Sequence, residues 1–146
     1  QGDIEGVSRG ALHYAASISG ADYVDALAKI HAYGRELATF FDGFDVLLTP
    51  TLAEPPAKIG RFNHTTEDYV QYRRGPDGIF AYSPFTAAFN ASGQPAMSVP
   101  LGMSPEGLPI GVHFAAAQGR DELLMSLAAD LERAAPWAGR RPALFG

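Results

Sequence analysis

The chain has 146 residues, of which 47% are hydrophobic and 18% are charged, as expected for one globular domain with a core of its own. Its formal net charge of −5 argues against a nucleic-acid partner, and the absence of cysteine excludes disulfides and thiolate metal sites. No apolar run approaches the length of a membrane span and no signal-peptide pattern opens the sequence, so we expect a cytoplasmic protein without a membrane partner.

Two helices are predicted in the first third of the chain. Residues 4–18 carry apolar side chains at helical spacing, which indicates a first helix. The run from Ser19 to Asp22 fits a capping box, in which the serine hydroxyl and the aspartate carboxylate each accept from a backbone N–H at the start of a helix. A second helix is therefore predicted from Gly20 to Phe41, and its apolar stripe favours packing on a core over a coiled coil.

Short apolar runs then predict two buried strands. Asp45–Thr49 is the first, and Pro50 ends it. Ala96–Val99 is the second, and it follows a run of turn-forming residues at Asn90–Gln94. We expect these two strands to pair in one sheet. Between them, Leu52–Arg61 contains prolines and a glycine and predicts a loop.

The remaining segments complete an α/β pattern. Thr65 opens a second capping-box spacing, which predicts a short helix over 66–74. A turn signal at 103–108 precedes alternating apolar residues at 109–115, and together they indicate a β-hairpin. Residues 121–135 form the last predicted helix, with acidic residues in its first turn. Its predicted buried stripe consists of Leu124, Leu127, Ala128 and Leu131. The expected fold class is therefore α/β, with a mixed β-sheet flanked by helices.

The sequence contains no self-contained catalytic or metal-binding motif. There is no G-x-S-x-G elbow, and no Gly-rich phosphate loop precedes a helix, so no cofactor is predicted. The four histidines are scattered, without ligand spacing, and are interpreted as partly buried or surface residues rather than as metal ligands or bases: His13, His31, His64 and His113.

Four segments follow the capped helix in a fixed order. They read FDVLLTPT (44–51), FTAAFNASGQPAMSVPLG (85–102), GLPIGVHF (107–114) and DELLMSLAADLE (121–132). In this order they resemble the C-terminal part of the amidase signature family, over nearly the whole chain. The stretch 81–100 most resembles the branch of that family related to cyclic-amide and aminohexanoate-oligomer hydrolases.

The resemblance implies an enzyme that hydrolyses a small-molecule amide. Family members use a serine nucleophile, a second serine on a cis peptide, and a lysine that starts the proton relay, as a lysine kept neutral can do. This chain has no adjacent serine pair, and its only lysines, Lys29 and Lys58, lie outside the family's lysine context. We therefore assign no catalytic residue to it. Residues 1–146 are expected to be the C-terminal segment of an amidase domain, without the N-terminal part that carries the triad, and inactive alone.

The resemblance also places two segments near a substrate cleft, at strand ends where ligands of α/β sheets gather. The candidate substrate-binding residues are Thr49, Asn90, Ser92 and Gln94. The alternative is that these side chains only satisfy backbone groups at a tight corner. The loop region from residue 52 to 79 is expected to shape substrate choice, and the residues to test there are Tyr69, Tyr72 and Tyr82.

Three interpretations of function remain open on the sequence. The first is an amidase segment whose partner is the missing N-terminal part of the same enzyme, with a homodimer as a further arrangement. It predicts an exposed apolar face and self-association of the isolated chain. The second is a non-catalytic binding or structural module derived from the amidase scaffold, which would be a well-behaved monomer. The third is an independent hydrolase with an unrecognised serine site.

Overall fold

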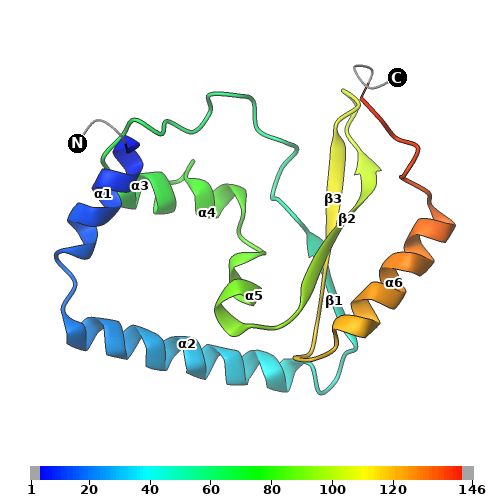
Figure 1. Cartoon of the computed structure of the whole chain (residues 1–146), viewed down its shortest axis with the longest axis horizontal. Coiled ribbons are helices and arrows are strands. Elements are labelled where there is room, and N and C mark those ends of the chain that lie inside the picture. Colours follow the sequence, from blue (N-terminus) through cyan, green and yellow to red (C-terminus); the bar gives the residue numbers. More distant parts are fainter. Residues whose placement is uncertain (1–3, 143–146) are drawn as a thin grey trace.

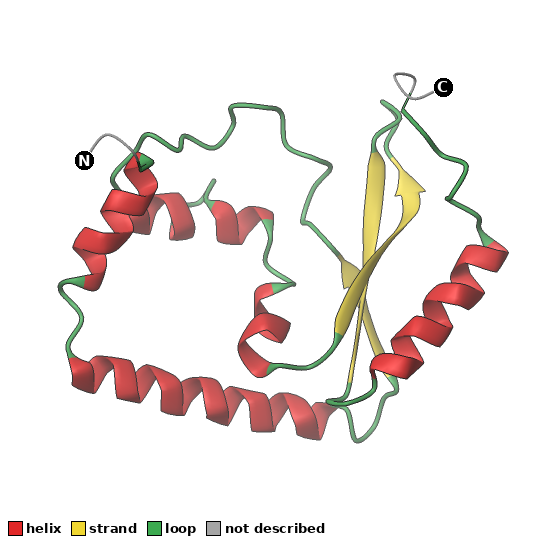
Figure 2. Cartoon of the chain, in the orientation of Figure 1, coloured by secondary structure: helices red, strands yellow, loops and turns green. Residues whose placement is uncertain are grey.

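The fold is built on a three-stranded sheet that stands at one end of the molecule (Figure 1). The computed structural model describes residues 4–142. Helix α6 lies along one flank of the sheet and α5 along the other, while α1, α3 and α4 gather at the opposite end (Figures 1 and 2). The elements are α1 (Gly6–Ala15), α2 (Gly20–Phe40), β1 (Val46–Pro50), α3 (Tyr69–Arg74), α4 (Ile79–Tyr82), α5 (Ala87–Ser92), β2 (Ala96–Met103), β3 (Pro109–Ala116) and α6 (Asp121–Ala134).

The sheet has the order β1-β3-β2, and both strand pairs are antiparallel. The hairpin of β2 and β3 is confirmed, and so is the α/β class with flanking helices. The predicted direct pairing of the first two strands is wrong, because β3 lies between them. The prolines are consistent with this order. Pro50 ends β1, and Pro100 lies at the register shift in β2. Proline has no N–H to donate, so it is tolerated in an edge strand, where one side of the backbone pairs with no neighbour. The predicted sheet was mixed, with parallel and antiparallel pairs. Among the described strands both pairs are antiparallel.

Each face of the sheet has its own small core. On the α6 side, Leu124 packs against a cluster that includes Val99 and Phe114. On the α5 side, Phe89 and Phe41 close over Ala115, which is fully buried. The last predicted helix is therefore confirmed in both its bounds and its buried stripe, within one residue at its end.

Helix α2 is formed as the capping box predicts, but it is not buried. Ser19 Oγ accepts from the Asp22 N–H at 3.1 Å, and Asp22 Oδ2 accepts from the Ser19 N–H at 3.0 Å. No residue of α2 is buried, and only its C-terminal end reaches the core, through Leu37 and through Phe41, the residue that follows the helix. The expected packing of its whole stripe on a core is wrong for the described residues, because this helix runs away from the sheet toward α1 (Figure 1).

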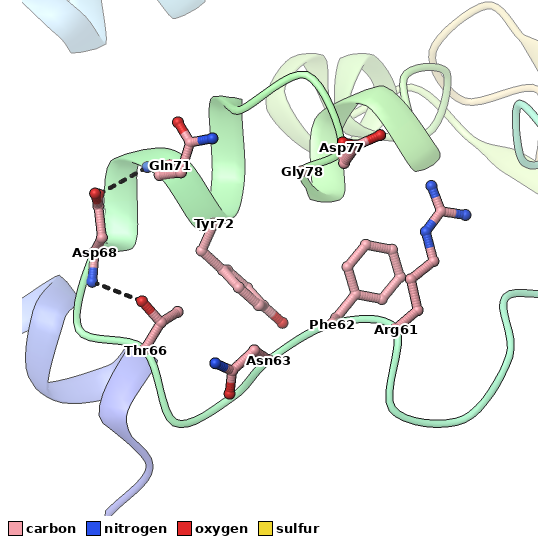
Figure 3. Close-up of a pocket in the computed structure, with 9 residues that line it drawn as sticks. All are labelled: Arg61, Phe62, Asn63, Thr66, Asp68, Gln71, Tyr72, Asp77 and Gly78. Carbon is pink, nitrogen blue, oxygen red and sulfur yellow. Dashed lines mark hydrogen bonds between the residues drawn. The ribbon is translucent and has the colours of Figure 1, made fainter.

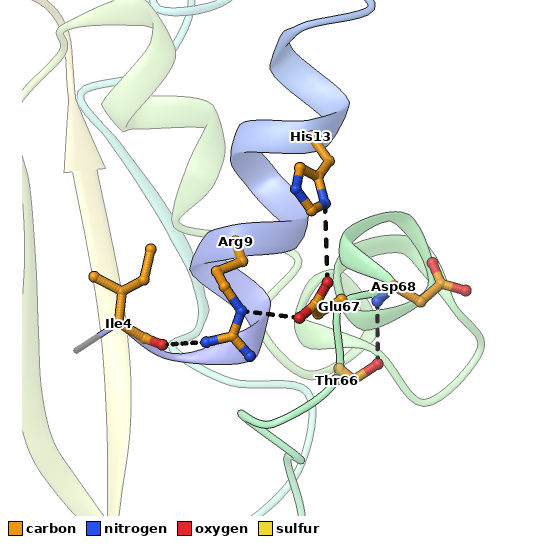
Figure 4. Close-up of polar contacts among 6 residues, drawn as sticks. All are labelled: Ile4, Arg9, His13, Thr66, Glu67 and Asp68. Carbon is orange, nitrogen blue, oxygen red and sulfur yellow. Dashed lines mark hydrogen bonds and ion pairs between the residues drawn. The ribbon is translucent and has the colours of Figure 1, made fainter. Parts of the chain in front are cut away.

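Helix α1 joins the segment before α3 through glycines and ion pairs (Figure 4). A β-carbon on Gly6 would lie 2.0 Å from the Thr65 carbonyl oxygen, and one on Gly10 would lie 2.1 Å from that of Glu67. Arg9 Nε contacts Glu67 Oε1 at 2.8 Å, and His13 Nδ1 lies 3.8 Å from the other carboxylate oxygen. The glycines therefore allow backbone contact, and the ion pair between Arg9 and Glu67 lies beside it.

Helix α3 begins later than the sequence predicted. Its N-cap is Asp68, whose Oδ1 accepts from the Gln71 N–H at 2.9 Å. The predicted cap, Thr65, instead donates its N–H and its hydroxyl to Asn63 Oδ1. An Asx turn therefore competes with the capping box for the threonine and shortens the helix. Across residues 4–142, no helix is both long and apolar enough to cross a membrane.

Candidate functional site

The predicted turn at Asn90–Gln94 is the end of a short helix. Helix α5 includes Asn90 and Ser92, so the expectation of a turn at these two residues is wrong. Gly93 closes the helix with φ at 79°, a backbone conformation that favours glycine, and its N–H donates to Phe89 O at 2.9 Å. Gln94 follows directly and leads into β2. The physical reason is that Asn, Ser and Gly serve a helix C-terminus as well as a free turn.

A groove of about 400 Å³ lies between α5 and the sheet. We name it the α5 groove. It contains two of the four predicted residues, Asn90 and Gln94. Its lining residues are Thr86, Phe89, Asn90, Gln94, Ala96, Met97, Ser98 and His113.

Thr49 reaches the α5 groove through His113. The two residues are register partners of β1 and β3, and the Thr49 hydroxyl shares a 2.9 Å hydrogen bond with His113 Nδ1. His113 is only 3% exposed, and the centroid of its ring lies 5.2 Å from that of Phe89. Burial lowers the pKa of His113 below its ordinary value, so the ring is neutral near pH 7. Thr49 therefore orients a neutral polar group at the wall of the groove.

A second hydroxyl contact crosses the same face of the sheet. Thr51 Oγ1 and Ser98 Oγ are 2.6 Å apart, although the two residues are 47 positions apart in sequence. Gly111 makes this possible, since a β-carbon there would lie 2.6 Å from the threonine oxygen and 2.7 Å from the serine oxygen. Because Gly111 of the central strand has no side chain, the hydroxyls of Thr51 and Ser98 on either side of it can come into contact.

Ser92 is separated from the other predicted residues. It lies on the side of α5 that faces α2, in a hollow of about 290 Å³ that Gly34 and Gln118 also line. Its buried Oγ has no hydrogen-bond partner among the described residues. The structure therefore brings Asn90 and Gln94 together, reaches Thr49 through His113, and leaves Ser92 outside the α5 groove.

The three tyrosines proposed for testing, Tyr69, Tyr72 and Tyr82, do not line the α5 groove. Tyr72 faces a different hollow, of about 260 Å³ (Figure 3). Its hydroxyl also lies 3.4 Å from His64 Nδ1. Tyr82 anchors the loop instead, because its hydroxyl accepts from the Ala57 N–H at 2.9 Å and its ring lies under the Arg61 guanidinium. The ring of Tyr69 packs against that of Tyr14 of α1 in a tilted arrangement, with the ring centroids 5.7 Å apart. The hollow of Figure 3 also contains Arg61, Asp68 and Asp77.

Neither lysine is placed for catalysis at the α5 groove. Lys29 Nζ pairs with Asp25 Oδ2 at 2.6 Å on the exposed surface of α2, and this neighbour raises the pKa of the lysine. Lys58 is exposed in the loop before α3. Between residues 4 and 142, no three His, Asp or Glu side chains gather in a way that could hold a metal ion.

Sequence reasoning did not single out His113 and Ser98, which line the α5 groove, or Thr51, which contacts Ser98. The available signal was the alternation in 109–115, which places Gly111 and His113 on one face of a strand. That signal becomes informative only when the strand is known to be central, since residues of a central strand meet both neighbours.

A family model described as Amidase matches residues 5–125 of this chain. A curated relative, the 6-aminohexanoate-cyclic-dimer hydrolase of Paenarthrobacter ureafaciens, is 35% identical over 146 residues. The match covers 98% of this chain and 30% of that relative. The chain thus spans about a third of the length of the curated relatives that it matches first.

Solved structures give the same picture. A structure of 6-aminohexanoate cyclic dimer hydrolase superposes with a TM-score of 0.86 at 32% identity, over 99% of this chain and 30% of that chain. A bacterial aryl acylamidase of the amidase signature enzymes superposes with a TM-score of 0.64 at 28% identity, over 89% of this chain and 28% of that chain.

Proposed function

Because this chain belongs to the amidase family, we propose that the intact protein hydrolyses a carbon–nitrogen amide bond of a small molecule. The observation that carries the proposal is the similarity along nearly the whole chain to a hydrolase of a cyclic amide, in sequence and in fold. The mechanism proposed is that of the family resemblance, with a serine nucleophile, a second serine on a cis peptide and a lysine. All three are proposed to lie outside this chain.

Residues 1–146 are proposed to be the C-terminal segment of the amidase domain. Two observations support this assignment. The chain spans 30% of the length of its curated relative, and α2 exposes apolar side chains such as Tyr23 and Val24 that the rest of a larger domain would cover. Neither Lys29 nor Lys58 lines the α5 groove, so the chain alone is expected to be inactive.

The α5 groove is proposed to form part of the substrate cleft. It contains Asn90 and Gln94, and His113 in its wall is held by Thr49. Ser92 lines the neighbouring hollow between α5 and α2. It is proposed to contact the substrate where the cleft extends around α5. A cytoplasmic location and a homodimer are further proposals, which cell fractionation and sedimentation of the intact protein test.

The test compares the full-length gene product with the 146-residue chain in one assay. Both are incubated with the 6-aminohexanoate cyclic dimer and with simple anilides, and both are treated with a fluorophosphonate probe that labels active serines. We expect hydrolysis and one labelled serine in the full-length protein, and neither in the chain alone. An inactive and unlabelled full-length protein would support the non-catalytic module instead. A labelled serine on the isolated chain would support an independent hydrolase.

A further inference from the structure

The α5 groove is distinguished by its lack of charge. Among the described residues, no Asp, Glu, Lys or Arg side chain lines it. Four other hollows in the same part of the chain each have at least one charged side chain in their lining. These are Arg61, Asp68 and Asp77 in the first, Arg9 and Glu67 in the second, Glu54 in the third, and Arg35 in the fourth.

Gln94 is a buried polar group of this groove that lacks a partner. The residue is only 5% exposed, and its Oε1 has no hydrogen-bond partner among the described residues. A buried amide oxygen without a partner costs free energy, so such groups are normally satisfied. A half-turn of the side-chain amide interchanges its oxygen and nitrogen, so Gln94 can accept from an N–H or donate to a carbonyl.

Resting on the proposed function, we infer that the α5 groove binds an uncharged, amide-bearing part of the substrate, and that Gln94 determines this specificity. An amide of the ligand offers one donor and one acceptor, which matches the Gln94 side chain group for group. Phe89 and Met97 supply apolar surface for the hydrocarbon on either side of that amide.

Charged ligand groups are disfavoured in the same place. A carboxylate or an ammonium group that leaves water for this groove meets no opposite charge among the described residues that line it, and an unpaired buried ion is strongly unfavourable. His113 does not change this balance, because the buried ring stays neutral near pH 7 with its pKa lowered, and its Nδ1 is already bonded to Thr49. The groove therefore selects against charge as well as for an amide.

The experiment uses the full-length protein and three anilides of equal chain length. Hexanoyl anilide ends in a methyl group, adipic acid monoanilide in a carboxylate, and 6-aminohexanoyl anilide in an ammonium group. We expect kcat/KM for the first to exceed that for either charged substrate by about tenfold or more. Equal values for the three substrates would overturn the inference, whatever the behaviour of any variant.

The variant Gln94→Glu places a carboxylate in the groove at nearly constant size. We expect it to raise the kcat/KM of the ammonium substrate relative to the methyl substrate by about tenfold, since the new charge pairs with the ammonium group. The control is Met125→Glu, which adds the same negative charge at a 72% exposed position of α6, outside the α5 groove, and should leave the ratio unchanged. If another segment of the enzyme satisfies Gln94, the variant loses stability and the ratio does not move, which would contradict the inference.

Binding separates this inference from the proposed function. Titration of the full-length protein with hexanamide and with hexanoate, followed by NMR or calorimetry, needs no turnover. Hydrolysis without charge preference leaves the proposed function standing and overturns the inference. Binding of hexanamide but not of hexanoate, by a protein that hydrolyses none of the anilides, supports the inference and contradicts the proposed function.

Discussion

His113 shows how one side chain acquires its chemistry from its neighbours. The residue lies in the central strand, so Thr49 and Ser98 are its register partners on either side. Helix α5 covers the ring through Phe89, and burial lowers the pKa. Because Nδ1 of the neutral ring is bonded to the Thr49 hydroxyl, only Nε2 is left for a hydrogen bond to a ligand.

The lowered pKa of His113 predicts that stability falls in mild acid. Below the ordinary value of 6.5 the unfolded chain binds a proton that the folded chain refuses, so the free energy of unfolding decreases as pH drops. This contribution to the loss of stability is complete once the pH lies below the pKa of His113 in the folded chain. We expect urea midpoints to fall more steeply from about pH 8 to about pH 5 in the wild type than in His113→Asn, which cannot titrate.

The comparison of the two pH profiles isolates His113, because the other histidines are present in both proteins. Asparagine keeps a polar group near the position of Nδ1, so the contact with Thr49 is preserved in kind. Parallel profiles for the wild type and His113→Asn would contradict the predicted coupling between burial and protonation.

At the scale of elements, α1 shows how glycines determine a helix contact. Gly6 and Gly10 are four residues apart and therefore share one face of the helix, and both are buried. The backbone of Thr65 and Glu67 lies against that face, at distances that leave no room for a β-carbon. The contact fixes the loop before α3, since Arg9 then reaches Glu67 (Figure 4).

The substitution Gly10→Ala is expected to destabilise this contact. Alanine is the better helix former, but its β-carbon would lie 2.1 Å from the Glu67 carbonyl oxygen and force α1 and the loop apart. We expect the free energy of unfolding to fall by roughly 1–3 kcal/mol, as overpacking typically costs. Denaturant unfolding monitored by circular dichroism measures the change.

Gly20→Ala is the matched control, at the first residue of α2. No atom lies within 4 Å of a β-carbon built there, so only helix propensity acts. The expected change is neutral to stabilising, by up to about 1 kcal/mol. If the two substitutions shifted stability equally, the close contact at Gly10 would not be responsible.

At the scale of the whole molecule, many large apolar side chains lie outside the two small cores and are exposed. Along α2, Tyr23 is 62% exposed, Val24 65%, Leu27 36% and Ile30 40%. Tyr23, Leu27 and Ile30 have the spacing of one helical stripe, which is the face that the sequence predicted to be buried. The stripe is formed as predicted, but the described part of the chain does not cover it.

The isolated 146-residue chain is therefore expected to self-associate through α2. Light scattering coupled to size exclusion should give a mass above that of a monomer, and the double variant Tyr23→Lys and Leu27→Lys should return it toward monomer. Met125→Lys, on α6 at 72% exposure, is the control for added charge and should change the mass little. A wild-type chain that is monomeric at high concentration would contradict the prediction and favour the non-catalytic module.

The sequence by itself determined the elements that carry strong local signals. The capping box at Ser19, the stripe of α6 and the hairpin of β2 and β3 are all local patterns, and each is confirmed. The resemblance carried by 44–51 and 85–102 also held, because family motifs are read from order and residue type alone. The same motifs gave Asn90 and Gln94 as candidate substrate-binding residues; both line the α5 groove, and their role in binding stays a prediction.

Only the tertiary structure decided which strands are neighbours and which side chains meet. Strand order depends on which edges can accept proline, and the pairing of Thr51 with Ser98 depends on the missing side chain of Gly111 between them. His113 was interpreted from sequence as a partly buried or surface residue, and its place in the groove wall follows from the central position of β3. Such contacts join residues far apart in the chain, and local pattern carries no information about which distant segment will fill a given face.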